Sequence, residues 1–76
     1  MTSEELTQVI STVRAHKGLP PLVELYPEMR LWEDVGFESL DLAELTVRIE
    51  EKCDVDVFAD GLVFTIGEIE ERLRRG

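Results

Sequence analysis

Ser39 is the residue in this sequence whose type and position best suit covalent chemistry. It follows the segment Gly36-Phe37-Glu38 and stands at the start of a predicted helix. A serine in that position usually serves only as an N-cap, whose side chain accepts a hydrogen bond from the backbone. Unpaired N–H groups and the helix dipole also stabilise an anion at a helix start.

The other groups that could do chemistry lack partners in the sequence. His16 is the only histidine, and we expect it on the surface, without the acid and oxyanion hole that a serine hydrolase needs. Cys53 falls on the core side of its helix, where a small buried hydrophobe is expected. The acids of residues 54–61 fail the register of a calcium loop, which needs Gly and Glu at fixed positions. We therefore expect no catalytic residue and no metal site.

The chain is short and strongly acidic. Its 76 residues allow one compact domain, residues 1–76, and 17 acidic against 8 basic residues give a net charge of −9. This charge disfavours nucleic acid and anionic membranes as partners and favours basic proteins. The single cysteine cannot form an internal disulfide. We expect a cytoplasmic monomer that does not insert into membranes.

Apolar periodicity predicts helices at both ends of the chain. In residues 4–17 the apolar side chains recur with the period of an amphipathic helix, at Leu6, Val9, Ile10 and Val13. Thr2 or Ser3 can cap the start of this helix. The last helix should begin after Thr65, which is predicted to form a capping box with Glu68.

A long loop and two further helices are predicted between these ends. Residues 19–37 contain all three prolines and fit no single period, so we expect an ordered loop anchored to the core by Leu31, Trp32 and Val35. A second helix is predicted from Ser39 to Cys53, and a short one within residues 59–64. The expected fold is all-α: a four-helix bundle of three main helices and one short helix, with a long first loop.

The helix predicted for residues 39–53 has apolar residues on two sides. One side is an ordinary core-facing stripe of Leu42, Leu45, Ile49 and Cys53. The nearly opposite side carries a second set, with acids among and beside it: Leu40, Ala43, Val47, Glu44 and Glu51, with Asp41 and Glu50 at the margins. Either the long loop covers this second face, or the face is a docking surface for basic partner proteins.

The segment around Ser39 resembles the phosphopantetheine attachment region of acyl carrier proteins. Residues 31–45 read LWEDVGFESLDLAEL, which is similar to the family's pattern of a Leu, acids, a Gly and then Asp-Ser-Leu leading into an acidic helix. The spacing of the first helix, the long loop, Ser39 and the closing helix also fits the family. The resemblance therefore covers essentially the whole chain.

The resemblance implies that Ser39 is the attachment point of 4′-phosphopantetheine, with Glu38 beside it. A separate phosphopantetheinyl transferase would transfer this group from coenzyme A with Mg²⁺, and the thiol of the arm would carry acyl groups as thioesters in fatty-acid, polyketide or related biosynthesis. The chain would then be a substrate of enzymes and not an enzyme. The other implied partners are an acyl- or aminoacyl-loading ligase and acyl-processing enzymes with basic docking surfaces. Partner recognition is implied for Leu40, Ala43, Glu44, Val47, Glu50 and Glu51, to which we add Asp41 at the margin of the same face.

Two departures from the family pattern indicate a specialised carrier rather than the housekeeping one of fatty-acid synthesis. Glu38 stands where the family usually has Asp, and the region between Val57 and Thr65 is short. Two other functions stay open. One is a peptidyl or aminoacyl carrier of nonribosomal-type synthesis, and the other is an unmodified helical adaptor that binds one protein through Leu40, Ala43 and Val47.

Overall fold

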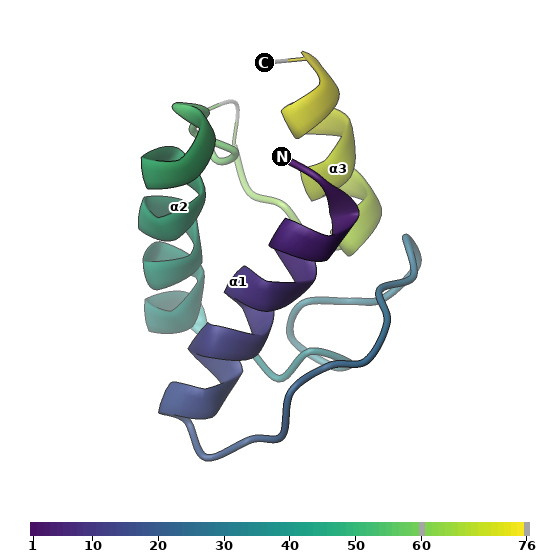
Figure 1. Ribbon diagram of the computed structural model, residues 1–76. Coiled ribbons are helices and arrows are strands. Elements are labelled where there is room, and N and C mark those ends of the chain that lie inside the picture. Colours follow the sequence, from purple (N-terminus) through teal and green to yellow (C-terminus); the bar gives the residue numbers. More distant parts are fainter. Residues whose placement is uncertain (60, 76) are drawn as a thin grey trace.

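The computed structural model describes residues 1–59 and 61–75, which form three helices (Figure 1). Helix α1 spans Ser3–His16, α2 spans Ser39–Cys53 and α3 spans Ile66–Arg75. The three main helices and the all-α class are therefore confirmed. Within the described residues the only pairing of extended backbone is an isolated antiparallel bridge between Arg30 and Thr65. Each described helix is too short or too polar to cross a membrane.

The short helix predicted within residues 59–64 is not confirmed. Of that segment, Asp60 lies outside the described residues, Ala59 belongs to a turn, Gly61 to a bend, and residues 62–64 have no regular structure. The Phe58 N–H donates to the Asp56 carboxylate at 3.0 Å, and the Gly61 N–H donates to the Phe58 carbonyl at 3.1 Å. A side chain that accepts a hydrogen bond from a nearby backbone N–H competes with the backbone hydrogen bonds of a helix. Gly61 also has a positive φ of 115°, which lies outside the helical range. The described fold is thus a three-helix arrangement.

The helix ends follow from capping residues that the sequence contains. Thr2 and Glu5 form a capping box at α1, with the Glu5 N–H donating to Thr2 Oγ1 and the Thr2 N–H donating to the Glu5 carboxylate. These two hydrogen bonds lower the pKa of Glu5. Thr65 and Glu68 bond to each other in the same way before α3. Each box satisfies N–H groups that a helix start leaves unpaired.

The core draws one stripe from each helix and several residues from the connecting segments. α1 contributes the stripe that periodicity predicts, and α2 contributes three members of its predicted stripe, Leu42, Leu45 and Ile49. Cys53, the fourth, is only half-buried at the end of α2, so its predicted burial is not confirmed. Phe37 is a fully buried residue from the loop. The buried apolar side chains are Leu6, Val9, Ile10, Val13, Leu31, Val35, Phe37, Leu42, Leu45, Ile49, Val57, Val63, Ile66 and Ile69. Because they come from the three helices, from the second half of the long loop and from the segment before α3, burial of this one cluster holds connecting segments as well as helices.

The long loop runs from the end of α1 past the start of α3 and returns to the start of α2 (Figure 1). Arg14 of α1 holds its two ends, donating to the carbonyls of Pro20 and Val35. The Leu31 N–H donates to the Phe64 carbonyl at 2.9 Å, which ties the middle of the loop to the residues before α3. Leu31 and Val35 are buried as predicted, but Trp32 remains 47% exposed, so its predicted anchoring role is wrong.

Candidate functional site

Ser39 is the first residue of α2, and its side chain is exposed. The N-cap position belongs to Glu38, whose N–H donates to the Asp41 carboxylate at 2.8 Å. Among the described residues, none forms a hydrogen bond with the Ser39 hydroxyl. The ordinary role of a serine at a helix start, capping the backbone, is therefore filled by its neighbours, and the hydroxyl is left available.

The backbone before Ser39 is held in place by two neighbouring residues. Phe37 is fully buried, and its N–H donates to the Leu31 carbonyl at 2.8 Å. Gly36 has a φ of 82°, a conformation that favours glycine, and a Cβ there would lie 3.2 Å from Leu19 Cδ1. The hydroxyl of Ser39 is therefore presented from a backbone that is anchored on its N-terminal side and helical on its C-terminal side.

Lys17 and Asp41 bring opposite charges together beside this site. Lys17 Nζ donates to Asp41 Oδ2 at 2.7 Å and to the Gly36 carbonyl at 2.9 Å. Burial acts to raise the pKa of the Asp41 carboxyl, but the hydrogen bonds from Lys17 and from the Glu38 N–H outweigh it, so this pKa lies below its usual value. The ammonium group also offsets negative charge at the start of α2.

An apolar groove of about 540 Å³ opens beside Ser39. The residues that line it come from the long loop, α2 and the segment before α3: Trp32, Ser39, Leu42, Ala43, Thr46, Asp56, Phe58, Leu62, Val63 and Phe64. Its volume lies within the range of small-molecule sites. Sequence analysis identified Ser39 but missed the groove, because Trp32, Phe58, Leu62 and Phe64 belong to segments without a regular period.

The outer face of α2 is open to solvent. Leu40 is 83% exposed and Val47 is 56% exposed, and Ala43 between them is also exposed. The possibility that the long loop covers this face is therefore contradicted. Glu50 and Glu51 are exposed, and no described residue forms an ion pair with either. We call Leu40, Ala43, Val47, Glu50 and Glu51 the outer face of α2.

Glu44 lies at the edge of the outer face and is engaged by two basic side chains. His16 Nδ1 and Arg48 Nε each lie 2.8 Å from Glu44 Oε2. The hydrogen bond from Arg48 is the main reason that the pKa of Glu44 lies below its usual value, with a smaller contribution from His16. His16 is exposed, as predicted, and its contact is with Glu44. Of the predicted recognition acids, Asp41 and Glu44 thus already have partners on the end of α1 or on α2 itself.

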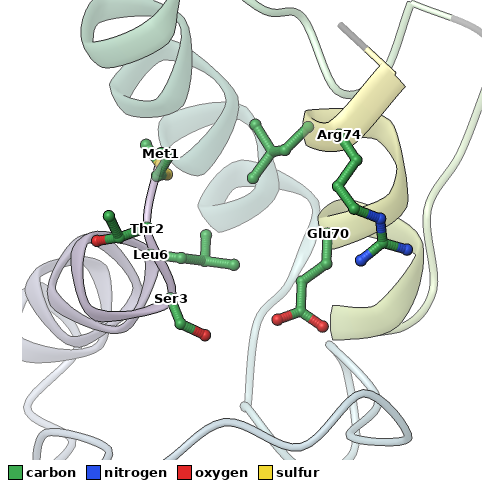
Figure 2. A pocket seen from close by; sticks show the side chains of 7 residues that line it. Met1, Thr2, Ser3, Leu6, Glu70 and Arg74 are labelled. Carbon is green, nitrogen blue, oxygen red and sulfur yellow. The ribbon is translucent and has the colours of Figure 1, made fainter.

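A smaller hollow of about 220 Å³ lies between the start of α1 and α3 (Figure 2). In Figure 2, Met1, Thr2, Ser3 and Leu6 come from the N-terminal side, and Glu70 and Arg74 face them from α3. This hollow shares no residue with the groove beside Ser39. The described residues also contain no group of three or more His, Cys, Asp or Glu placed to hold a metal ion.

Two comparisons, with family models and with solved structures, find no match for this chain. The inference of function therefore depends on the residues around Ser39 and their geometry.

Proposed function

We propose that this protein is an acyl carrier, in which the Ser39 hydroxyl bears 4′-phosphopantetheine. The observation that carries the proposal is the exposed hydroxyl of Ser39, which has no capping role and stands at the rim of an apolar groove. The resemblance of residues 31–45 to a carrier attachment region is the second support. When bound, the group supplies a thiol on a long arm that holds acyl groups as thioesters.

The attachment step requires Ser39 to act as a nucleophile toward coenzyme A. Its Oγ forms a bond to the phosphorus next to pantetheine, the pyrophosphate P–O bond breaks, adenosine 3′,5′-bisphosphate leaves and the hydroxyl proton passes to a base. Since no described residue accepts a hydrogen bond from Ser39, the base and the Mg²⁺ would belong to a separate transferase. The resulting phosphodiester lies at unpaired N–H groups of α2, near Lys17.

The outer face of α2 suits the partners that such a carrier needs. Leu40, Ala43 and Val47 offer a small apolar centre, and Glu50 and Glu51 add negative charge at one end. A net charge of −9 attracts basic proteins over a longer range. These partners would be the transferase, a loading ligase and acyl-processing enzymes, and the chain would be their substrate in fatty-acid, polyketide or related biosynthesis.

A second candidate function is favoured by the same face. An unmodified adaptor would use Leu40, Ala43 and Val47 to bind one protein and would not need the Ser39 hydroxyl. The exposure of the outer face supports this alternative as well as the carrier. The free hydroxyl and the adjoining groove support the carrier, because the adaptor gives neither of them a role.

The deciding experiment is intact-mass measurement after incubation with coenzyme A, Mg²⁺ and a broad-specificity phosphopantetheinyl transferase. Ser39→Ala is the test variant. Ser3→Ala is the matched control, because Ser3 is also an exposed serine at the first position of a helix. The carrier predicts one phosphopantetheine on the wild type and on Ser3→Ala, and none on Ser39→Ala. Absence of the addition with several transferases would contradict the proposal and favour the adaptor. Addition to Ser39→Ala would contradict the assignment of Ser39 as the attachment point.

A further inference from the structure

We propose that Lys17, the residue that follows α1, is a positioning residue for the transfer of phosphopantetheine to Ser39. This inference rests on the proposed function, because it concerns the step in which the Ser39 hydroxyl attacks coenzyme A. It adds a residue outside the attachment segment that controls the rate of this step. Lys17 acts through the residues on both sides of Ser39 and not on the reacting atoms.

The Lys17 ammonium binds two acceptors that lie far ahead of it in the chain. Its Nζ donates to the Gly36 carbonyl at 2.9 Å and to Asp41 Oδ2 at 2.7 Å. These acceptors follow Lys17 by 19 and 24 positions, one before Ser39 and the other after it. The lysine side chain is only 26% exposed. A basic residue at the end of a helix is stabilised by the helix dipole alone, so these two contacts are additional to that ordinary role.

Asp41 connects Lys17 to the residue directly before Ser39. The oxygen that accepts from Lys17, Asp41 Oδ2, also accepts from the Glu38 N–H at 2.8 Å. Glu38 is the N-cap of α2, so this hydrogen bond holds the backbone where the helix begins. Without the ammonium, the Asp41 side chain would lose one of its two restraints, and the first turn of α2 would open more often.

Arg14 binds the carbonyl next to the one that Lys17 binds. Arg14 lies three positions before Lys17, so both side chains extend from the same end of α1. Arg14 Nη1 donates to the Val35 carbonyl, and Lys17 Nζ donates to the Gly36 carbonyl. Two successive carbonyls are thus bound by side chains from the end of α1. The position of the segment that leads to Ser39 is therefore set by this helix.

The position of Ser39 should affect the rate of transfer more than it affects docking. The Ser39 hydroxyl accepts and donates no hydrogen bond within the described part of the chain, so its place is set by the backbone. A misplacement of about 1 Å can slow a reaction about a hundredfold. The outer face of α2, which would bind the transferase, does not include Lys17. Loss of the lysine should therefore slow transfer and leave docking nearly unchanged.

The test measures single-turnover transfer to the full chain with the transferase in excess, followed by intact mass. The plateau rate reports the transfer step, and the transferase concentration that gives half of this rate reports docking. Lys17→Met should lower the plateau rate about tenfold and change the half-saturating concentration less than about twofold. Lys17→Arg keeps the charge and several donors, so it should restore most of the rate.

Lys52→Met is the matched control. Lys52 is the other lysine of the chain, it is exposed, and no described residue forms an ion pair with it. The change removes the same charge at the far end of α2 and should leave the plateau rate at the wild-type value. An equal fall for Lys52→Met would assign the effect to net charge. A change in the half-saturating concentration alone would assign it to direct contact with the transferase. Either result would overturn the inference.

Amide exchange in the unmodified chain tests the positioning itself. Exchange of the Glu38 N–H should be about fivefold faster in Lys17→Met than in the wild type, while amides in the middle of α2 keep their rates. Equal exchange at Glu38 in the two proteins would also overturn the inference.

The two proposals fail in different ways. If the mass of the wild type shows no addition, the carrier function is wrong and the role of Lys17 falls with it. If the wild type is modified and Lys17→Met is modified as fast, the carrier function stands and only the positioning role of Lys17 is wrong.

Discussion

The Lys17 ammonium and the Asp41 carboxylate form a 2.7 Å ion pair that joins the end of α1 to the first turn of α2. Asp41 also accepts a hydrogen bond from the Glu38 N–H, and Lys17 also donates to the Gly36 carbonyl. One carboxylate and one ammonium therefore hold the residues on both sides of Ser39. The pair is largely shielded from solvent, so it should contribute more than an ordinary surface ion pair.

Replacement of Asp41 by Asn should lower the free energy of unfolding by about 1 kcal/mol at pH 7. Asn keeps an oxygen that can accept from the Glu38 N–H, so the change removes mainly the interaction with Lys17. The folded-state pKa of Asp41 lies below its unfolded value of about 3.9. Its contribution is therefore present above about pH 4 and is lost as the pH falls through the folded-state pKa.

Urea denaturation of the wild type and Asp41→Asn at several values between pH 7 and pH 2.5 checks this prediction. The difference between the two proteins should shrink below about pH 4. Glu28→Gln is the control, because Glu28 is exposed and should give little difference at any pH. A difference that stays constant across this range would show that Asp41 does not act through its charge.

Replacement of Gly36 by Ala should destabilise the protein more than replacement of Gly18 by Ala. Both glycines have positive φ, 82° and 78°, and each should cost about 1 kcal/mol for that conformation. A Cβ at Gly36 would also lie 3.2 Å from Leu19 Cδ1, whereas one at Gly18 would meet nothing within 4 Å. The midpoints of urea denaturation, compared between variants with equal m-values, measure the two losses in the free energy of unfolding. Equal costs would mean that Leu19 moves freely and that the close contact does not matter.

Replacement of Arg72 by Gln should loosen the segment that forms one wall of the groove. Arg72 Nη1 donates to the carbonyls of Val57 at 2.7 Å and Gly61 at 2.8 Å, which ties this segment to α3. We expect a loss of about 2 kcal/mol in the free energy of unfolding, together with faster amide exchange in the described residues 57–64. Arg75→Gln is the control, because Arg75 is exposed in the same last turn of α3. Equal effects of the two changes would assign the loss to the helix dipole.

Replacement of Glu51 by Lys should slow modification of Ser39 by a phosphopantetheinyl transferase. Glu51 is an exposed acid of the outer face of α2, and reversal of its charge should lower kcat/KM about tenfold at low ionic strength. The effect should diminish as added salt screens the charges. Glu28→Lys makes the same change of net charge on the long loop, away from α2. A similar fall for Glu28→Lys would show that net charge matters and the outer face does not.

Much of the fold could be predicted from local sequence patterns. Leu6, Val9, Ile10 and Val13 predicted the buried face of α1, and Thr65 with Glu68 predicted the start of α3. These features depend on residues three or four positions apart, whose relation in a helix is fixed by its geometry. The segment 59–64 was misjudged for the opposite reason, because Asp56 and Gly61 shape its backbone by contacts that have no helical period.

Local patterns in the sequence were enough to predict the three main helices, the serine at the start of α2 and the two apolar faces of that helix, because each is a property of a continuous segment. The exposure of the outer face of α2, the place of Trp32 and the pairing of the acids depend on contacts between segments that are distant in the chain. Trp32 lines the groove together with residues of α2 and of the segment before α3, and Glu44 contacts His16, which lies 28 positions earlier in the chain (44 − 16). Both arrangements exist only because the fold brings different segments together. Such contacts depend on how the loops close over one shared core, and no local spacing of residues encodes that.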